Sequence, residues 1–287
     1  MFSEQSNTVR HTASMLAKML SLAALASVVL PGTSLCQTAL ALGEHNVVLN
    51  GVRLWYEVAG QRQAGEAPVV FLHGGPGYNS YSFQKTIGPR LERHALMIYL
   101  DERGAGHSER PWTGAYDMPT LVQDVEALRQ SLDLPSISLM GHSFGGTITL
   151  EYASRYSEHV QKLIILDGAA DIPKSLDLWR TQLEQRYPDA WRGTLSGDKG
   201  KSYLQATSGN DSCVIARIEF AAEMELTMPV LVIVGKYDRA VGVEQMQYMA
   251  DHLPHARFDE FNQSAHFVYA EEPDKFEHDV VEFLAGR

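Results

Sequence analysis

The feature that most constrains this sequence is a serine set between two glycines, where an apolar run gives way to a helical pattern. Residues Gly141-His142-Ser143-Phe144-Gly145 follow the apolar run Ile137–Met140, and Thr147–Ala153 behind them reads as a helix. A sharp turn from strand to helix strains its middle residue and leaves no room for side chains at the flanking positions, so glycine is needed there. The pattern predicts that Ser143 is lifted above the edge of a sheet, with a helix N-terminus behind it that favours negative charge.

Short apolar runs and helical patterns alternate along most of the chain. Two strands, Val47–Asn50 and Val52–Val58, are predicted to form a hairpin around Asn50-Gly51. Further strands are predicted at Pro68–Leu72, Ala95–Leu100, Ile137–Met140, Lys162–Leu166, Pro229–Val234 and Ala256–Phe261. Helices are predicted at Leu121–Leu132, Val243–Leu253 and Pro273–Leu284. This alternation implies an α/β fold with a mostly parallel twisted sheet flanked by helices. Ligands of such sheets bind at the carboxyl ends of the strands, where the chemical motifs of this chain also fall.

Residues 169–228 break the alternation of strands and helices. They hold Trp179, Trp191 and helical fragments, and they lie between two late strands. We expect a small helical cap inserted above the strand ends, where it would choose the substrate. The core would then consist of 42–168 and 229–287, which suits a 287-residue chain that is 45% hydrophobic and 21% charged.

The N-terminus has the pattern of a signal peptide over residues 1–41. Arg10 and Lys18 precede the apolar run Met19–Leu30, and Ala39-Leu40-Ala41 supplies a cleavage site. The run is too short to span a bilayer, so we expect no stable membrane insertion after processing. The pattern predicts a periplasmic or secreted protein, with an unprocessed tail or a membrane anchor as the alternatives.

The charge and the cysteines argue against several classes of function. A net charge of −11 disfavours nucleic acid or an anionic membrane surface as a partner. Cleavage after Ala41 would remove Cys36 and leave Cys213 single, so a disulfide framework is not expected. No Cys or His spacing suits a metal. We expect no metal and no cofactor, a small molecule or short peptide as substrate, and leave the oligomeric state open.

Two further residues complete a candidate catalytic set around Ser143. A serine hydroxyl becomes a good nucleophile when a base takes its proton, and that base is usually a histidine oriented by a carboxylate. Asp238 and His266 each follow a predicted strand, so their loops can converge on the serine. We assign Asp238 as the orienting acid and His266 as the general base and acid. Asp167, at the end of another strand, is the alternative acid.

Attack by the serine creates an oxyanion, which needs hydrogen-bond donors already in position. One donor is expected to be the backbone N–H of Phe144, next after the nucleophile. The second is expected from the loop His73-Gly74-Gly75-Pro76-Gly77, which follows a strand and lacks bulky side chains. Gly75 is the first choice and Gly74 the second, because proline has no N–H to donate.

Together these residues resemble the proline iminopeptidase branch of the α/β-hydrolases. The resemblance covers most of the chain after Val47. Its markers are His73-Gly74-Gly75-Pro76-Gly77, Asp101-Glu102-Arg103-Gly104-Ala105-Gly106-His107-Ser108, the segment around Ser143, Gly235-Lys236-Tyr237-Asp238, and His266. It implies the α/β-hydrolase fold and a serine peptidase that releases N-terminal proline or another small residue from short peptides.

The resemblance also bears on the substrate. Ala216-Arg217-Ile218-Glu219 is similar to the cap segment in which a glutamate of these peptidases holds the substrate's free amino group. Glu223 stands four residues later on a predicted helix, so the two carboxylates would repel unless a cation lay between them. Both are therefore candidate substrate-binding residues, with two solvated surface glutamates as the alternative.

The sequence departs from that family at three points. The cap is shorter, His142 and Phe144 flank the nucleophile in place of the usual residues, and Arg239 follows the acid where some members have a second carboxylate. A carboxylesterase or lactonase with the same triad is therefore kept as the alternative reaction. A non-catalytic binding protein on this fold is the alternative of a different class.

Overall fold

The structure is a computed structural model, and it describes residues 40–112, 115–168, 175, 181, 184–189 and 226–286. The predicted signal peptide lies outside the described residues except for its last two positions. Most of the predicted cap also lies outside them, including Glu219 and Glu223, as do both cysteines. None of the helices within the described ranges is long and apolar enough to cross a membrane.

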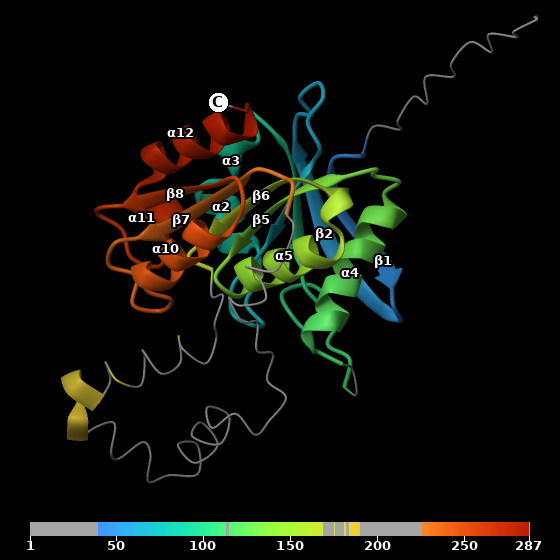
Figure 1. Cartoon of the computed structure of the whole chain (residues 1–287). Coiled ribbons are helices and arrows are strands. Elements are labelled where there is room, and N and C mark those ends of the chain that lie inside the picture. The colour runs from blue at the N-terminus through green and yellow to red at the C-terminus, as the bar shows by residue number, and fades with distance from the viewer. Residues whose placement is uncertain are drawn as a thin grey trace, which may run out of the picture. The chain divides into compact units, whose positions relative to one another are not determined.

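Eight strands form one sheet in the order β1-β2-β4-β3-β5-β6-β7-β8. The strands are β1 Gly43–Leu49, β2 Val52–Gly60, β3 Val69–Leu72, β4 Leu96–Asp101, β5 Ile137–His142, β6 Val160–Leu166, β7 Val230–Gly235 and β8 Ala256–Phe261. β2 pairs antiparallel with β1 and β4, and all other neighbours are parallel (Figure 1). The prediction of a mostly parallel sheet is confirmed.

Helices flank both faces of this sheet (Figure 1). The described helices are α2 Tyr81–Thr86, α3 Gly88–Leu91, α4 Met118–Ser131, α5 Phe144–Arg155, α10 Val243–His252, α11 Val268–Glu271 and α12 Pro273–Leu284, with a 3₁₀ turn at Ser157–His159. The predicted helices correspond to α4, α5, α10 and α12. The short helices α2, α3 and α11 were not predicted, because four to six residues carry too little periodicity.

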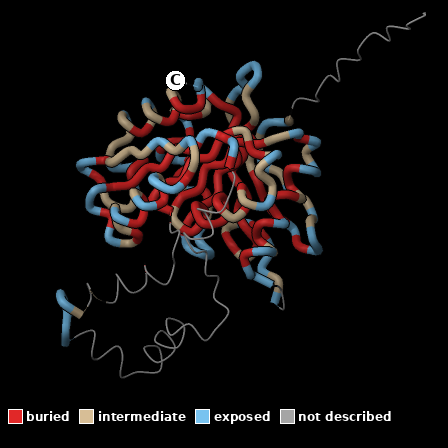
Figure 2. The backbone as a smooth tube through the Cα atoms, in the orientation of Figure 1, coloured by how far each residue is buried: buried red, intermediate tan, exposed pale blue. Residues whose placement is uncertain are grey.

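The core has two halves, one on each face of the sheet, because successive strand residues point to opposite sides. On β3, Val70 and Leu72 pack with side chains of α4, α5 and α10, whereas Val69 and Phe71 pack with side chains of α2, α3, α11 and α12. Burial on both faces accounts for the unbroken apolar runs that predicted the central strands. Figure 2 shows the buried strands enclosed by partly exposed helices.

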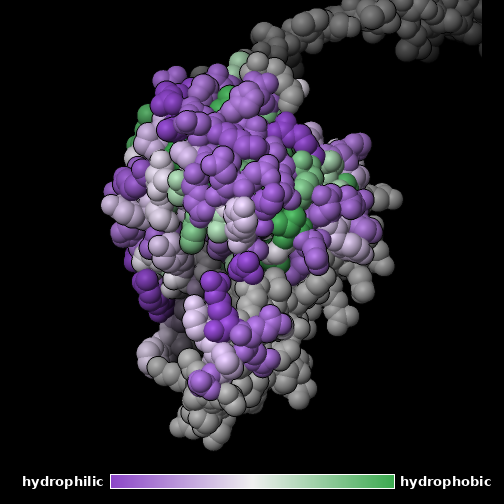
Figure 3. Space-filling view, turned by 90° about the vertical axis from the view of Figure 1, so that its left-hand side faces the viewer, coloured by the Kyte–Doolittle hydropathy of each residue, from purple (hydrophilic) through white to green (hydrophobic). Residues whose placement is uncertain are grey.

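The two edges of the sheet are protected differently. At one edge, β1 and β2 turn through Asn50 and Gly51, both with positive φ, as a tight hairpin requires. The amide of Asn50 donates to Asp124 of α4 at 2.9 Å, which ties the turn to the helix layer. At the other edge, β8 carries charged side chains such as Asp259, which lies 2.6 Å from Lys275 of α12. The hydrophilic surface in Figure 3, which faces this side, disfavours pairing with another strand.

Candidate active site

The turn between β5 and α5 holds Ser143 in a strained backbone conformation, with φ 54° and ψ −118°. Both flanking glycines are required by close backbone contact. A Cβ at Gly141 would lie 2.6 Å from the nitrogen of Gly146, and one at Gly145 would lie 2.6 Å from the carbonyl oxygen of His73. The helix therefore packs directly on the ends of β3 and β5, and the serine is placed above the sheet as predicted from the glycine spacing.

Ser143, His266 and Asp238 form a chain of hydrogen bonds across three separate loops. The Nε2 atom of His266 lies 3.0 Å from the hydroxyl oxygen of Ser143. The Nδ1 atom of the same ring lies 3.0 Å from Oδ2 of Asp238. With Nδ1 protonated, Nε2 is free to accept the serine proton, which is the tautomer that a general base needs.

Asp238 is buried and held by several donors. Its Oδ1 accepts from the backbone N–H of Ala240 at 2.6 Å and of Val241 at 3.2 Å, which leaves Oδ2 for His266. Burial acts to raise the pKa of Asp238, but the bonds from His266 and from the two amides outweigh it and lower the pKa below the usual value. Asp238 is therefore ionised beside the imidazole at neutral pH.

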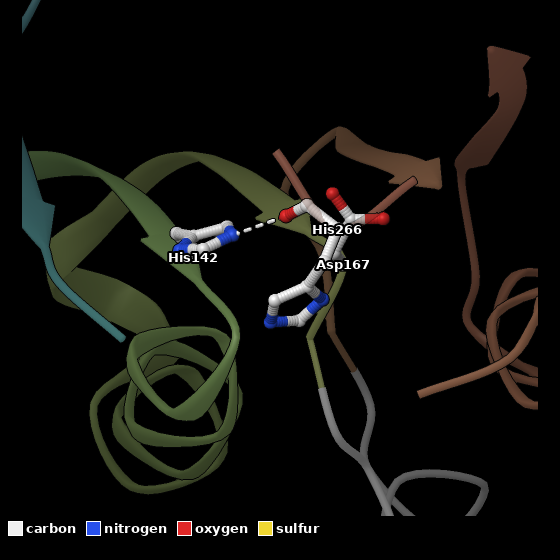
Figure 4. A group of neighbouring side chains, drawn as sticks. All are labelled: His142, Asp167 and His266. Carbon is white, nitrogen blue, oxygen red and sulfur yellow. Dashed lines mark hydrogen bonds between the residues drawn. The ribbon is translucent and has the colours of Figure 1, made fainter. Parts of the chain in front are cut away.

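His142, for which no role was predicted, contacts the loop that carries His266. Its Nε2 lies 2.7 Å from the carbonyl oxygen of His266, and the two rings lie 4.9 Å apart (Figure 4). Burial, with the charge of the neighbouring His266 second, lowers the pKa of His142 to about 3. His142 is thus neutral at working pH and donates its Nε2 proton to that carbonyl. No sequence pattern indicates this contact, which joins the end of β5 to a loop residue 124 positions later in the chain.

The glycine-rich loop after β3 lies beside the serine. A Cβ placed on Gly74 would be 3.0 Å from Cβ of Ser143, whereas one on Gly75 would instead meet the backbone of Gly77 and Tyr78. The loop therefore passes Ser143 at Gly74, and Phe144 begins α5 directly after the serine. Gly75, the first choice for the second oxyanion donor, faces the backbone of its own loop, and the donor assignment stays a prediction.

A buried histidine supports this loop from below. His73 is almost fully buried, and its Nδ1 lies 2.7 Å from the carbonyl oxygen of Gly74. Its other nitrogen accepts from the backbone N–H of Glu102 at 3.4 Å. Burial, despite the opposing effects of Gly74 and Asp101, lowers the pKa of His73, so the ring is neutral. This arrangement holds the loop in place by neutral hydrogen bonds.

The remaining predicted residues are placed as follows. Asp167 directly follows β6 and is buried near Asp238 and His266, but the carboxylate hydrogen-bonded to the His266 ring is that of Asp238. Glu219 and Glu223 lie outside the described residues. Exposed aromatic residues near these groups in the chain include Tyr78, which follows the glycine loop, and Phe267, whose ring lies 5.4 Å from that of His266.

Three comparisons relate this chain to known proteins. A family model described as "alpha/beta hydrolase fold" matches residues 67–208. A proline iminopeptidase of Saccharolobus solfataricus is 25% identical, over 82% of this chain and 89% of that protein. A soluble epoxide hydrolase of Corynebacterium sp. is 33% identical over 46% of this chain and 44% of that protein. The crystal structure of a proline iminopeptidase from Mycobacterium smegmatis matches with a TM-score of 0.68 and 21% identity, over 85% of this chain and 98% of that one.

Proposed function

Because this chain has the alpha/beta hydrolase fold, we propose that it is a serine hydrolase that acts through an acyl-enzyme. Ser143 is the nucleophile, His266 the general base and acid, and Asp238 the orienting acid. The observation that carries the proposal is the pair of 3.0 Å contacts from the two ring nitrogens of His266 to the hydroxyl and to the carboxylate. Nucleophile, base and orienting group in this order are the geometry that such catalysis needs.

The reaction follows from these contacts. As the oxygen of Ser143 attacks the substrate carbonyl carbon, its proton passes to Nε2 of His266. Asp238 stabilises the positive ring through Nδ1. The ring then gives that proton to the departing amine or alcohol, which leaves the acyl group on the serine. A water molecule loses its proton to the same nitrogen, attacks the acyl carbon and releases the acid, while the serine regains its proton.

The tetrahedral intermediate places negative charge on the former carbonyl oxygen. We assign the N–H of Phe144 and an N–H of the Gly74-Gly75 segment as its donors. Support comes from the closeness of Gly74 to the serine and from the start of α5 at Phe144. Loss of one such donor typically costs about 3 kcal/mol of transition-state stabilisation.

For the substrate, we propose a short peptide or amide with a free N-terminal proline or small residue. Support comes from the His73-Gly74-Gly75-Pro76-Gly77 loop and from relatives named proline iminopeptidase, among them the Saccharolobus protein. In this proposal 169–228 form the cap, and Glu219, with Glu223 as the second candidate, binds the substrate ammonium group.

A carboxylesterase or lactonase reaction is the second candidate, and one observation favours it. Tyr78 and Phe267, the exposed aromatic residues beside the described site, present apolar surface rather than charge to a bound substrate. An ester with an apolar acyl group would gain from contact with these rings, and it needs no carboxylate partner.

A fluorophosphonate probe tests the catalytic proposal. We expect the probe to modify Ser143, as read by mass spectrometry, and Ser143→Ala to lose both labelling and the turnover of a p-nitrophenyl ester. Ser154→Ala is the matched control, because this serine lies on the same helix and its hydroxyl donates to the carbonyl of Glu151, one turn back, at 2.7 Å. Equal labelling of the Ser143→Ala variant would refute the assignment.

Paired substrates separate the two reactions. If the chain is a peptidase, it turns over proline p-nitroanilide. Glu219→Gln then lowers kcat/KM for that amide by about 10- to 100-fold, the value of a lost charged hydrogen bond, and leaves ester turnover unchanged. Glu158→Gln, at an exposed glutamate outside the site, is the control. Ester turnover without amide turnover, unchanged by Glu219→Gln, would establish the esterase reading instead.

The chain's location is a separate proposal. Residues 1–41 are inferred to be a cleaved signal peptide, which makes the mature protein periplasmic or secreted. Support comes from the basic start, the apolar run and the small-residue site at Ala39-Leu40-Ala41. N-terminal sequencing of protein from an expressing bacterium is expected to begin after Ala41, and an intact Met1 would count against export.

A further inference from the structure

A second carboxyl group lies buried at the catalytic centre without a complete set of partners. Asp167 directly follows β6 and is fully buried, with its backbone at a positive φ of 43°. Its Oδ1 accepts from the backbone N–H of Gly235 at 2.9 Å, and its own N–H donates to the carbonyl of Ile233. Oδ2 is equally buried and has no hydrogen-bond donor among the described residues. Leaving a charged oxygen in that state would be costly.

The groups that face Asp167 limit which hydrogen-bond partner its Oδ2 atom can have. Its carboxyl lies near the ring nitrogens of His142 and His266, and one ligand atom of each of the three residues falls within 4.8 Å of the others (Figure 4). Nε2 of His142 already donates to the His266 carbonyl, and both nitrogens of His266 are engaged in the triad. Asp238 lies within hydrogen-bonding reach of Asp167, and Glu271 adds a more distant negative charge.

Two neighbouring carboxyl groups at such a site do not both ionise, because burial and mutual repulsion both favour one neutral partner. Asp238 has three donors, and its pKa is lowered. Asp167 has one donor, and burial first, then the charge of Asp238, raise its pKa well above the usual value. The proton of the pair therefore belongs on Asp167, where it turns an oxygen without a donor into a donor itself.

We propose that Asp167 is a positioning residue of the triad, which keeps its proton and donates it in a hydrogen bond to Asp238. The two carboxyl groups then carry a single negative charge toward His266. The inference rests on the proposed function only for the role of Asp238, since the protonation of the pair is a property of the folded chain. This hydrogen bond holds the Asp238 carboxylate in the orientation that His266 requires.

The test follows the ring signals of His266 by NMR against pH, with His266→Gln used to assign them. In Asp167→Asn, the amide keeps both the donor and the neutral charge, so we expect the midpoint of the His266 titration to stay within about 0.3 pH unit of the unmodified chain. If Asp167 were ionised, the same change would remove a negative charge beside the ring. The midpoint would then move about one unit lower, and the proposal would be overturned.

A second variant tests the hydrogen bond itself. Asp167→Val removes the hydrogen-bond donor, so the negative charge of Asp238 is no longer stabilised by that bond. Asp238 then binds the protonated His266 ring more strongly. We expect the His266 midpoint, and with it the acid limb of the pH–rate profile, to move to higher pH. An unmoved midpoint in a folded Asp167→Val variant would show that no such bond exists.

A third measurement needs no variant and no activity. In unmodified protein labelled with ¹³C at its aspartate carboxyl carbons, we expect one aspartate to show the chemical shift of a protonated acid at neutral pH, close to the Gly235 amide. Absence of that signal would overturn the proposal even if the variants failed to fold. Failure of the proposed function is read separately, from the fluorophosphonate label on Ser143, so the two results cannot be confused.

Discussion

Replacing Gly145 with alanine places a methyl group where α5 packs on the end of β3. The new Cβ would lie 2.6 Å from the carbonyl oxygen of His73, and closer still to that of Leu72. Ordinary contact needs roughly 3.5 Å, so the helix and the strand must separate by about 1 Å. Both obstacles are backbone atoms of a buried parallel strand, and they have no rotamer by which to move aside.

Two effects follow from this separation. Overpacking of a close-packed interior typically costs about 1–3 kcal/mol, which corresponds to a fall in Tm of roughly 2–9 °C for a chain of this size. The helix also carries Phe144 and follows Ser143, whereas the strand leads into His73 and Gly74. A shift of about 1 Å between them misaligns the proposed nucleophile and the proposed oxyanion donors, for which a loss of about 10²-fold in kcat/KM is expected.

The assay combines ester turnover, the rate of fluorophosphonate labelling and thermal unfolding. Gly65→Ala is the matched control, because a Cβ there meets nothing within 4 Å while the backbone has a positive φ of 82°. It lies in the loop before β3, at the opposite end of that strand from the serine. We expect Gly65→Ala to lose stability alone and Gly145→Ala to lose both stability and rate. Full turnover by Gly145→Ala would refute the claim that this glycine sets the distance between serine and loop.

Two further predictions concern stability. Because burial lowers the pKa of His142 to about 3, the unfolded chain takes up this proton near pH 6.5 and the folded chain does not. The stabilisation that comes from the neutral His142 ring is complete above that pH and falls by on the order of 4 kcal/mol as the pH drops toward 3. Urea unfolding of His142→Gln should therefore show a smaller loss of stability in acid than the unmodified chain. The same pH dependence of stability in both proteins would contradict the assignment. Arg103 and Asp124 are both buried, and Arg103 donates to Asp124 at 2.7 Å. Arg103→Met therefore leaves a buried carboxylate without its cation. We expect a loss of about 3–5 kcal/mol in unfolding free energy, with ester kcat/KM nearly unchanged in the folded fraction.

The strands that the sequence predicted best are those buried on both faces. Along β5 and β7 every residue is buried, so hydrophobic side chains run without interruption and mark the strand directly. β1 is different: its residues alternate between intermediate and exposed, and it begins at Gly43 rather than at Val47 as predicted. The polar residues that start it are held in the sheet by pairing with β2, which composition does not reveal.

The tight turn that carries Ser143 was predictable because its backbone geometry requires particular residues. A side chain at Gly141 or Gly145 would collide with the neighbouring backbone, so the glycine spacing identified the turn without knowledge of the fold. His142 lies in the same motif, yet its contact with the His266 carbonyl joins loops that only the folded sheet brings together. A residue that holds another loop in place produces no local sequence pattern, so sequence analysis alone does not identify it.

The choice between Asp167 and Asp238 shows where sequence reasoning ends. Each aspartate follows a buried parallel strand, and their strands are neighbours in the sheet, so both reach the same edge. The difference lies in the supply of donors. Two amides and the His266 ring stabilise charge on Asp238, whereas Asp167 has one amide and an oxygen with no donor among the described residues. An acid that must balance a positive imidazole has to be the one that ionises readily, and donor geometry, not position along the chain, favours Asp238 for the proposed role.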